Sequence, residues 1–187
     1  MTNIKTISKF MQALLLIGLI GLPIAVLSFW LALTNTPHSI PNFLSSTFLI
    51  PSPERLIDLR QIHWQANNAL IGFIADIISV SIIMLGLWLL SIIFKRYANG
   101  DIFVSENARD YERLGIILII YNLLIKPLNG LLTTLAITLN NGIGHRFISL
   151  TFTGANAQGI FTGVILIIIA KLMLEASRLA DDQKFII

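Results

Sequence analysis

The sequence contains no cysteine and few charged residues, and both features limit what the chain can be. Without cysteine there is no disulfide framework, no thiolate metal site and no thiol nucleophile. Only 12% of the 187 residues are charged, about half the fraction found in an ordinary soluble domain. No charged residue lies between Lys9 and Glu54, between Asp76 and Lys95, or between Arg146 and Lys171. Uncharged stretches of this length exclude a soluble fold and indicate a protein that crosses a membrane several times.

Four apolar runs approach or exceed the roughly 20 residues that a membrane-spanning helix needs. We expect spans over about residues 11–33, 70–94, 114–139 and 157–174. The first run is longer than the apolar core of a secretory signal peptide, which has about 7–15 residues, so we interpret it as a retained span. The predicted fold is therefore all-α: a single polytopic membrane domain of four transmembrane helices in an antiparallel bundle.

The positions of lysine and arginine predict the orientation in the membrane. With both termini on the inner side, nine of the 13 basic residues lie inside, three lie outside, and Lys126 lies within a span. This excess follows the positive-inside rule, so we expect cytoplasmic termini. The remaining segments are two outer loops, a cytoplasmic loop and a cytoplasmic tail: 34–69, 140–156, 95–113 and 175–187. Because this topology explains the net charge of +3, we expect no direct binding of nucleic acid.

The outer loops carry weaker patterns. Ser52-Pro53-Glu54 is typical of a helix start, and the one-sided apolar pattern after it favours a surface helix over residues 56–64. A loop packed on the bundle is the alternative. Residues 147–152 favour a short strand. Trp30 and Trp64 fall at the outer interface, where an aromatic belt is expected.

Small residues line one side of the first and fourth spans. The members of the two stripes are Gly18, Gly21, Ala25, Ser28 and Ala32 in the first, and Gly159, Gly163, Ala170 and Ser177 in the fourth. Small side chains let helices approach closely in lipid. We interpret the stripes as packing seams, with a ligand groove as the alternative.

The second and third spans each have a polar face. Their members are Gln65, Asn68, Gly72, Asp76, Ser79 and Gly86 in the second, and Gly115, Asn122, Lys126, Asn129 and Thr133 in the third. We expect the two faces to meet or to line a hydrated cleft, and we take Asp76, Asn122, Lys126 and Asn129 as intramembrane candidates. Helix geometry places Asp76 and Lys126 at different depths, so contact between them stays open. A structural role and a proton, ion or ligand role both remain open.

The cytoplasmic loop contains the segment Asn-Gly-Asp-Ile-Phe-Val-Ser-Glu-Asn-Ala-Arg at residues 99–109. Asn99-Gly100 predicts a turn, and Ser105 is expected to cap the helix that follows. Ile102 and Phe103 are apolar side chains in a charged loop, and they either plug the inner mouth of the bundle or dock a partner. The candidate docking residues are Asp101, Phe103, Ser105, Glu106 and Asn107.

This segment, followed by Arg113-Leu114-Gly115, resembles a bacterial family of four-span membrane proteins catalogued only as a domain of unknown function. Members carry a Gly-x-x-Phe-Thr/Ser-x-Glu-Asn segment at this place and an acidic, then apolar, tail. Here the tail departs from that ending at Asp182-Gln183-Lys184. The resemblance implies a multi-pass protein of the bacterial cytoplasmic (inner) membrane. Since members are often encoded beside Xre-type helix-turn-helix regulators, it also implies such a regulator as a cytoplasmic partner.

Two functions follow as hypotheses. The first is an accessory or regulatory module that presents its cytoplasmic loop and tail to a partner, while the spans contact the lipid bilayer. The alternative is a small transporter or a proton- or ion-conducting protein using Asp76 and Lys126. No nucleophile–base pair, metal cluster or pair of intramembrane carboxylates is present, so we expect no enzyme, no catalytic residue, no metal and no cofactor. Association with a second copy of the chain stays open.

Overall fold

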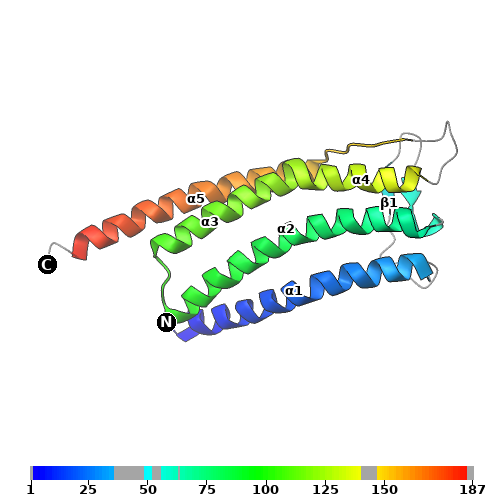
Figure 1. Cartoon of the computed structure of the whole chain (residues 1–187). Coiled ribbons are helices and arrows are strands. Elements are labelled where there is room, and N and C mark those ends of the chain that lie inside the picture. Colours follow the sequence, from blue (N-terminus) through cyan, green and yellow to red (C-terminus); the bar gives the residue numbers. More distant parts are fainter. Residues whose placement is uncertain (1, 36–48, 52–55, 63, 140–146, 185–187) are drawn as a thin grey trace. The chain divides into compact units, whose positions relative to one another are not determined.

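The computed structural model describes residues 2–35, 49–51, 56–62, 64–139 and 147–184 (Figure 1). Nearly all of them are helical. The helices are α1 (Thr2–Asn35), α2 (Ala66–Asn99), α3 (Ser105–Ile120), α4 (Lys126–Thr138) and α5 (Gly154–Lys184). A π-helical turn, η4 (Tyr121–Ile125), connects α3 to α4, and a 3-10 turn, η3 (Leu59–Gln61), precedes α2. The two short strands are β1 (Leu49–Pro51) and β2 (Leu56–Asp58).

Four helical stretches are long and apolar enough to cross a membrane: Ile4–Asn35, Ala66–Asn99, Ser105–Thr138 and Gly154–Leu179. The third comprises α3, η4 and α4. Large apolar side chains such as Ile17, Trp88 and Phe161 are exposed along these helices, as expected of surfaces that contact lipid. The predicted fold class, all-α with four transmembrane helices, is confirmed.

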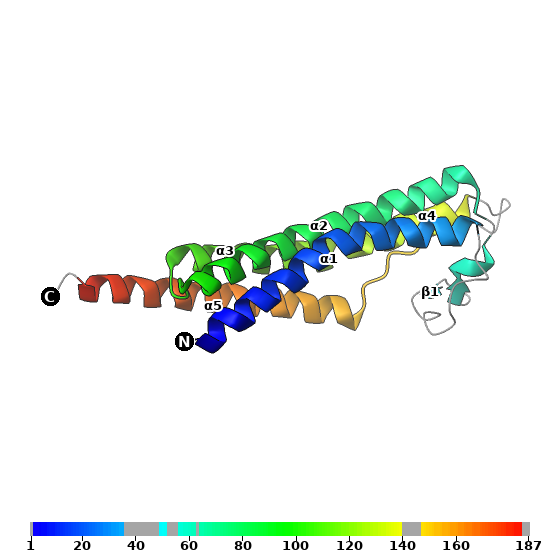
Figure 2. The ribbon, with the colours of Figure 1, turned by 90° about the horizontal axis from the view of Figure 1, so that it is seen from below.

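The helices extend beyond the predicted spans. Helices α1 and α2 have 34 residues each, or about 51 Å at 1.5 Å per residue, against a hydrocarbon core of about 30 Å. The backbone of α1 stays helical through Pro23 (Figure 2). The expected loop over 95–113 shrinks to residues 100–104, and most of the expected tail belongs to α5.

The described residues form two compact units. Unit 1 contains those within Met1–Gly21, Ile82–Leu123 and Gly154–Ile187, and unit 2 contains those within Leu22–Ser81 and Leu124–Thr153.

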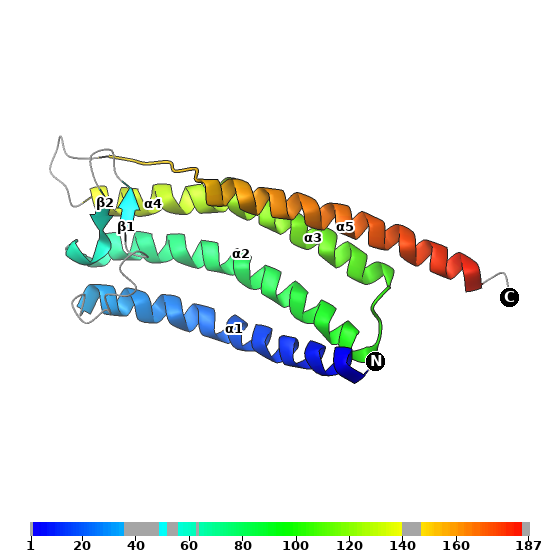
Figure 3. The same ribbon diagram turned by 180° about the vertical axis from the view of Figure 1, so that it is seen from behind.

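In unit 1, α3 and α5 lie side by side (Figures 1 and 3). Their backbones approach closely at two glycines. A Cβ atom on Gly115 would lie 2.6 Å from the carbonyl oxygen of Gly163, and one on Gly163 would lie 2.7 Å from that of Gly115. The packing seam predicted for the fourth span is thereby confirmed. The seam predicted for the first span forms only in part among the described residues. A Cβ on Gly18 would lie 3.6 Å from Leu87 on α2, whereas Gly21 has no atom near its Cβ position and Ser28 is exposed.

Unit 2 is built around two buried tryptophans. The rings of Trp30 and Trp64 meet edge to face at 5.1 Å, and Leu33, Leu59 and Ile137 complete the cluster. The indole N–H of Trp64 donates to the carbonyl of Leu59 at 2.8 Å. The expected aromatic belt is therefore wrong for both tryptophans, because their indoles are buried in the protein core.

The surface helix expected over residues 56–64 is wrong. Strand β2 pairs antiparallel with β1, with Ile50 opposite Ile57, and η3 follows (Figure 3). The Asp58 carboxylate accepts the backbone N–H of Arg60 and pairs with its guanidinium at 2.6 Å, which fixes the turn. The alternative, a loop packed on the bundle, describes residues 56–62 correctly. Residues 52–54, the expected helix start, lie outside the described residues.

The strand expected over residues 147–152 is also wrong. The backbone N–H of Phe147 donates to the hydroxyl of Thr138 on α4, and that hydroxyl donates to the Phe147 carbonyl. The N–H of Ser149 donates to the hydroxyl of Thr134 at 3.2 Å. Threonine side chains thus take the backbone hydrogen bonds that a neighbouring strand would need.

Candidate functional site

The loop between α2 and α3, predicted to be cytoplasmic, begins at a tight turn after α2. The N–H of Gly100 donates to the carbonyl of Tyr97 at 3.1 Å, and that of Asp101 donates to the carbonyl of Arg96 at 3.0 Å. These two bonds define a Schellman motif, which needs a left-handed residue after the helix. Gly100 supplies it with φ at +102°. The turn predicted at Asn99-Gly100 is confirmed, and it directs the chain back toward α3.

Asn107 holds this loop from within. Its side chain is completely buried. The amide Nδ2 donates to the carbonyls of Asp101 at 2.7 Å and Ile102 at 2.9 Å, while its Oδ1 accepts from Arg96 Nη1 at 3.1 Å. Asn107 is therefore unavailable as the docking residue that the sequence suggested. It shapes the loop that carries the other candidates.

An ion-pair network continues from Asn107. Nη1 of Arg96, on α2, also lies 2.7 Å from Oδ2 of Asp110, on α3, and Arg113 lies 2.8 Å from the other oxygen of the same carboxylate. Asp110 is nearly buried, so its charge is shared between two guanidinium groups in a partly desolvated place. The network joins the two helices that flank the loop and holds them in one arrangement.

Phe103 lies on the outside of this braced loop. Its side chain is 69% exposed, so the expectation that it plugs the inner mouth of the bundle is wrong. Asp101 and Glu106 are also exposed, whereas Ser105 is half-buried. The capping role expected of Ser105 is wrong as well, because Val104 occupies the N-cap position of α3. The hydroxyl of Ser105 donates instead to Glu106 at 3.3 Å.

The second candidate site surrounds Asp76, in unit 2. One carboxylate oxygen accepts the indole N–H of Trp30 at 2.8 Å, and the other accepts Nδ2 of Asn129 at 2.9 Å. Both donors are neutral, and no ion pair of Asp76 occurs in the part of the chain that the structure describes. The predicted meeting of the two polar faces therefore occurs at Asp76 and Asn129.

The other intramembrane candidates lie elsewhere. Lys126 is exposed and forms no ion pair with Asp76. Asn122 belongs to unit 1, where its Nδ2 donates to the carbonyl of Leu118 and its own carbonyl accepts Nδ2 of Asn156 at 2.8 Å. Its side chain fills the space that a Cβ on Gly159 would need. Asn122 and Gly115 thus face α5, and their part of the predicted polar face is a packing seam.

Sequence reasoning missed three residues of these sites. Trp30 was assigned to the membrane interface, although a tryptophan buried beside a carboxylate usually donates its N–H. Arg96 and Asp110 are not among the candidate residues that the sequence predicts. Their spacing across a tight turn between two helices was the available signal, because residues on either side of such a turn face each other. Among the described residues, no group of His, Cys, Asp or Glu is placed to hold a metal ion.

The fold and these sites define a multi-pass membrane protein with a braced loop between α2 and α3 and a polar contact between residues of its apolar helices. A family model described as a protein of unknown function (DUF2975) matches residues 56–187. The chain belongs to this family. No curated protein and no solved structure matches it.

Proposed function

We propose that the chain is an accessory or regulatory membrane module of the bacterial inner membrane, which presents its α2–α3 loop to a cytoplasmic protein. One observation supports the proposal most strongly: Phe103 is 69% exposed on a loop that is held in place by the hydrogen bonds among Asn107, Arg96 and Asp110. An exposed aromatic side chain on a rigid support gives affinity at low entropic cost. The proposed role is docking without catalysis.

The charges beside Phe103 support a basic partner. Asp101 and Glu106 are exposed on either side of it in sequence, and neither forms an ion pair within the described chain. An apolar pocket with a basic rim would complement this surface. Helix-turn-helix regulators are basic because they contact DNA phosphates, and a regulator of the Xre type encoded beside the gene is the partner we propose.

The proposal is tested by crosslinking in the native bacterium, purification in mild detergent and mass spectrometry. Wild type is compared with Phe103→Ala and with Phe152→Ala, which removes a similarly exposed phenylalanine from the outer loop. We expect the regulator with wild type and with Phe152→Ala, and its loss with Phe103→Ala. Equal recovery with all three proteins, or recovery of membrane proteins alone, contradicts the docking role.

A second candidate function is that of a small transporter or proton- or ion-conducting protein. The observation in its favour is that Asp76, at membrane depth, contacts only neutral donors in the described chain. Lys126 is not its counter-ion, so a relay between the two has no support from the contacts. Loss of flux in Asp76→Asn at normal expression, with flux retained in Lys126→Gln, is the result expected of this function.

A further inference from the structure

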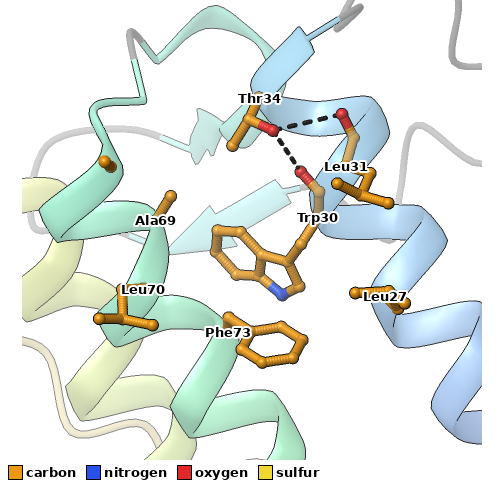
Figure 4. A pocket seen from close by; sticks show the side chains of 8 residues that line it. Leu27, Trp30, Leu31, Thr34, Ala69, Leu70 and Phe73 are labelled. Carbon is orange, nitrogen blue, oxygen red and sulfur yellow. Dashed lines mark hydrogen bonds between the residues drawn. The ribbon is translucent and has the colours of Figure 1, made fainter.

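An open pocket lies in unit 2 between α1 and α2 (Figure 4). Its volume is about 230 Å³. This is smaller than the roughly 300–1,000 Å³ of sites for drug-sized ligands, so any ligand must be small. The lining is apolar and aromatic apart from one hydroxyl: Leu27, Trp30, Leu31 and Thr34 on α1, and Ala66, Ala69, Leu70 and Phe73 on α2. Figure 4 shows Trp30 on α1 and Phe73 on α2 among the side chains of this lining.

Trp30 belongs both to this pocket and to the Asp76 contact. Its ring lines the pocket, while its N–H donates to the Asp76 carboxylate at 2.8 Å. The ring is held in place on its other side as well, because any Cβ on Gly72 would collide with it. A carboxylate that accepts the indole N–H makes the ring more electron-rich. This strengthens the attraction between the ring and a positive charge beside it.

The Asp76 side chain has no cationic partner within the described chain. Asp76 accepts two neutral donors, and no lysine or arginine forms an ion pair with it. Ser79 lies three residues further along α2, and its buried hydroxyl has no hydrogen-bond partner in the described structure. A carboxyl group on a membrane-spanning helix favours a nearby positive charge. The apolar lining of the pocket disfavours a hydrated inorganic ion.

We propose that this pocket binds a small lipophilic organic cation, such as a quaternary ammonium compound. The apolar part of the ligand packs against Leu27, Leu70 and Phe73, and its cationic head lies against the ring of Trp30. Asp76 supplies the balancing charge through its contact with the indole. This proposal rests on the pocket and on Asp76, so it is independent of any partner at Phe103. It concerns binding of the cation, whether or not the cation is carried across the membrane.

The test uses the full chain in nanodiscs of zwitterionic lipid, with empty nanodiscs as the blank. The probe is benzyltrimethylammonium, and binding is measured by isothermal titration calorimetry. Neopentylbenzene, which replaces the charged nitrogen by carbon and keeps the shape, serves as a neutral competitor. We expect saturable binding of the cation that the neutral compound does not displace at equal concentration.

Two variants locate the site. Asp76→Asn keeps the size of the side chain and removes its charge, and we expect at least tenfold weaker binding of the cation. Trp30→Phe keeps an aromatic ring and removes the N–H that contacts Asp76, and we expect weaker binding again. Asp58→Asn is the matched control, since it removes a carboxylate of the same unit that is already paired with Arg60.

Three results overturn the proposal. They are the absence of saturable binding to wild type, equal affinity in Asp76→Asn and wild type, and equal displacement by the neutral competitor, which would indicate an apolar groove for lipid chains. If Asp76→Asn does not fold, the comparison between cation and neutral competitor on the wild type still decides the question.

Discussion

Replacing Asn107, on α3, by alanine should destabilise the protein by releasing the α2–α3 loop. The side chain is completely buried and makes three hydrogen bonds, two to backbone carbonyls and one to a guanidinium. A neutral hydrogen bond contributes about 0.5–1.5 kcal/mol, and one to a charged group about 1.5–3 kcal/mol. Arg96 keeps its contact with Asp110, and water reaches part of the loop, so we expect a loss of about 2–4 kcal/mol.

The measurement is the free energy of unfolding by denaturant titration in detergent micelles, together with hydrogen exchange of the loop amides. Asn99→Ala is the matched control, because it removes the same side chain from an exposed position at the other end of the same turn. We expect the control to change stability by less than about 0.5 kcal/mol. Hydrogen exchange should accelerate at residues 100–107 in Asn107→Ala alone.

Asn107→Asp distinguishes the acceptor role of this side chain, toward Arg96, from its donor role, toward the two carbonyls. A carboxylate still accepts the hydrogen bond from Arg96, but it cannot donate to the carbonyls of Asp101 and Ile102. It would instead place an acceptor oxygen within hydrogen-bond distance of these two carbonyl oxygens. We expect Asn107→Asp to be at least as destabilising as Asn107→Ala. Near-native stability in both variants, matching Asn99→Ala, would refute the role assigned to this side chain.

Two further predictions concern packing and acid sensitivity. Gly163→Ala should force α3 and α5 apart and lower the free energy of unfolding by about 1–3 kcal/mol. Gly130→Ala is the control, because Gly130 has no atom near its Cβ position, and it should leave the melting temperature almost unchanged. Equal melting temperatures of the two variants would contradict the close approach of α3 and α5. The side-chain hydrogen bond from Arg60 holds the pKa of Asp58 below its ordinary value of 3.8. The Asp58–Arg60 pair should therefore stabilise the segment before α2 fully above about pH 4, and lose that effect as the pH falls further. Proteolysis of this segment should accelerate in acid for wild type and lack this step in Asp58→Asn.

Several features could be predicted because they depend on local pattern. The uncharged stretches indicate the spans, since lipid penalises charge whatever the tertiary structure. Asn99-Gly100 predicts the turn because glycine alone adopts a positive φ there without strain. The small residues of the fourth span predict its contact with another helix, and Gly163 makes that contact with Gly115.

Other features depend on contacts between distant residues and could not be read from the pattern. Asp76 accepts from Trp30, 46 positions earlier, and from Asn129, 53 positions later. Periodicity placed Asn122 and Lys126 on the same helix face as Asn129, but the π-helical turn at Tyr121–Ile125 changes the angular spacing between residues before and after it. Asn107 was a docking candidate on sequence grounds, and only the fold shows that its side chain is buried and bonded to Arg96, Asp101 and Ile102.

The central claim is that Phe103 is presented to a cytoplasmic partner, and site-specific photocrosslinking tests it most directly. Benzoylphenylalanine replaces Phe103 in one version of the chain and Phe152 in another, and both are irradiated in living cells. The account predicts a crosslink from position 103 to a soluble helix-turn-helix regulator and none from position 152. Crosslinks from position 103 to lipid or to the chain itself, without any soluble protein, would contradict it.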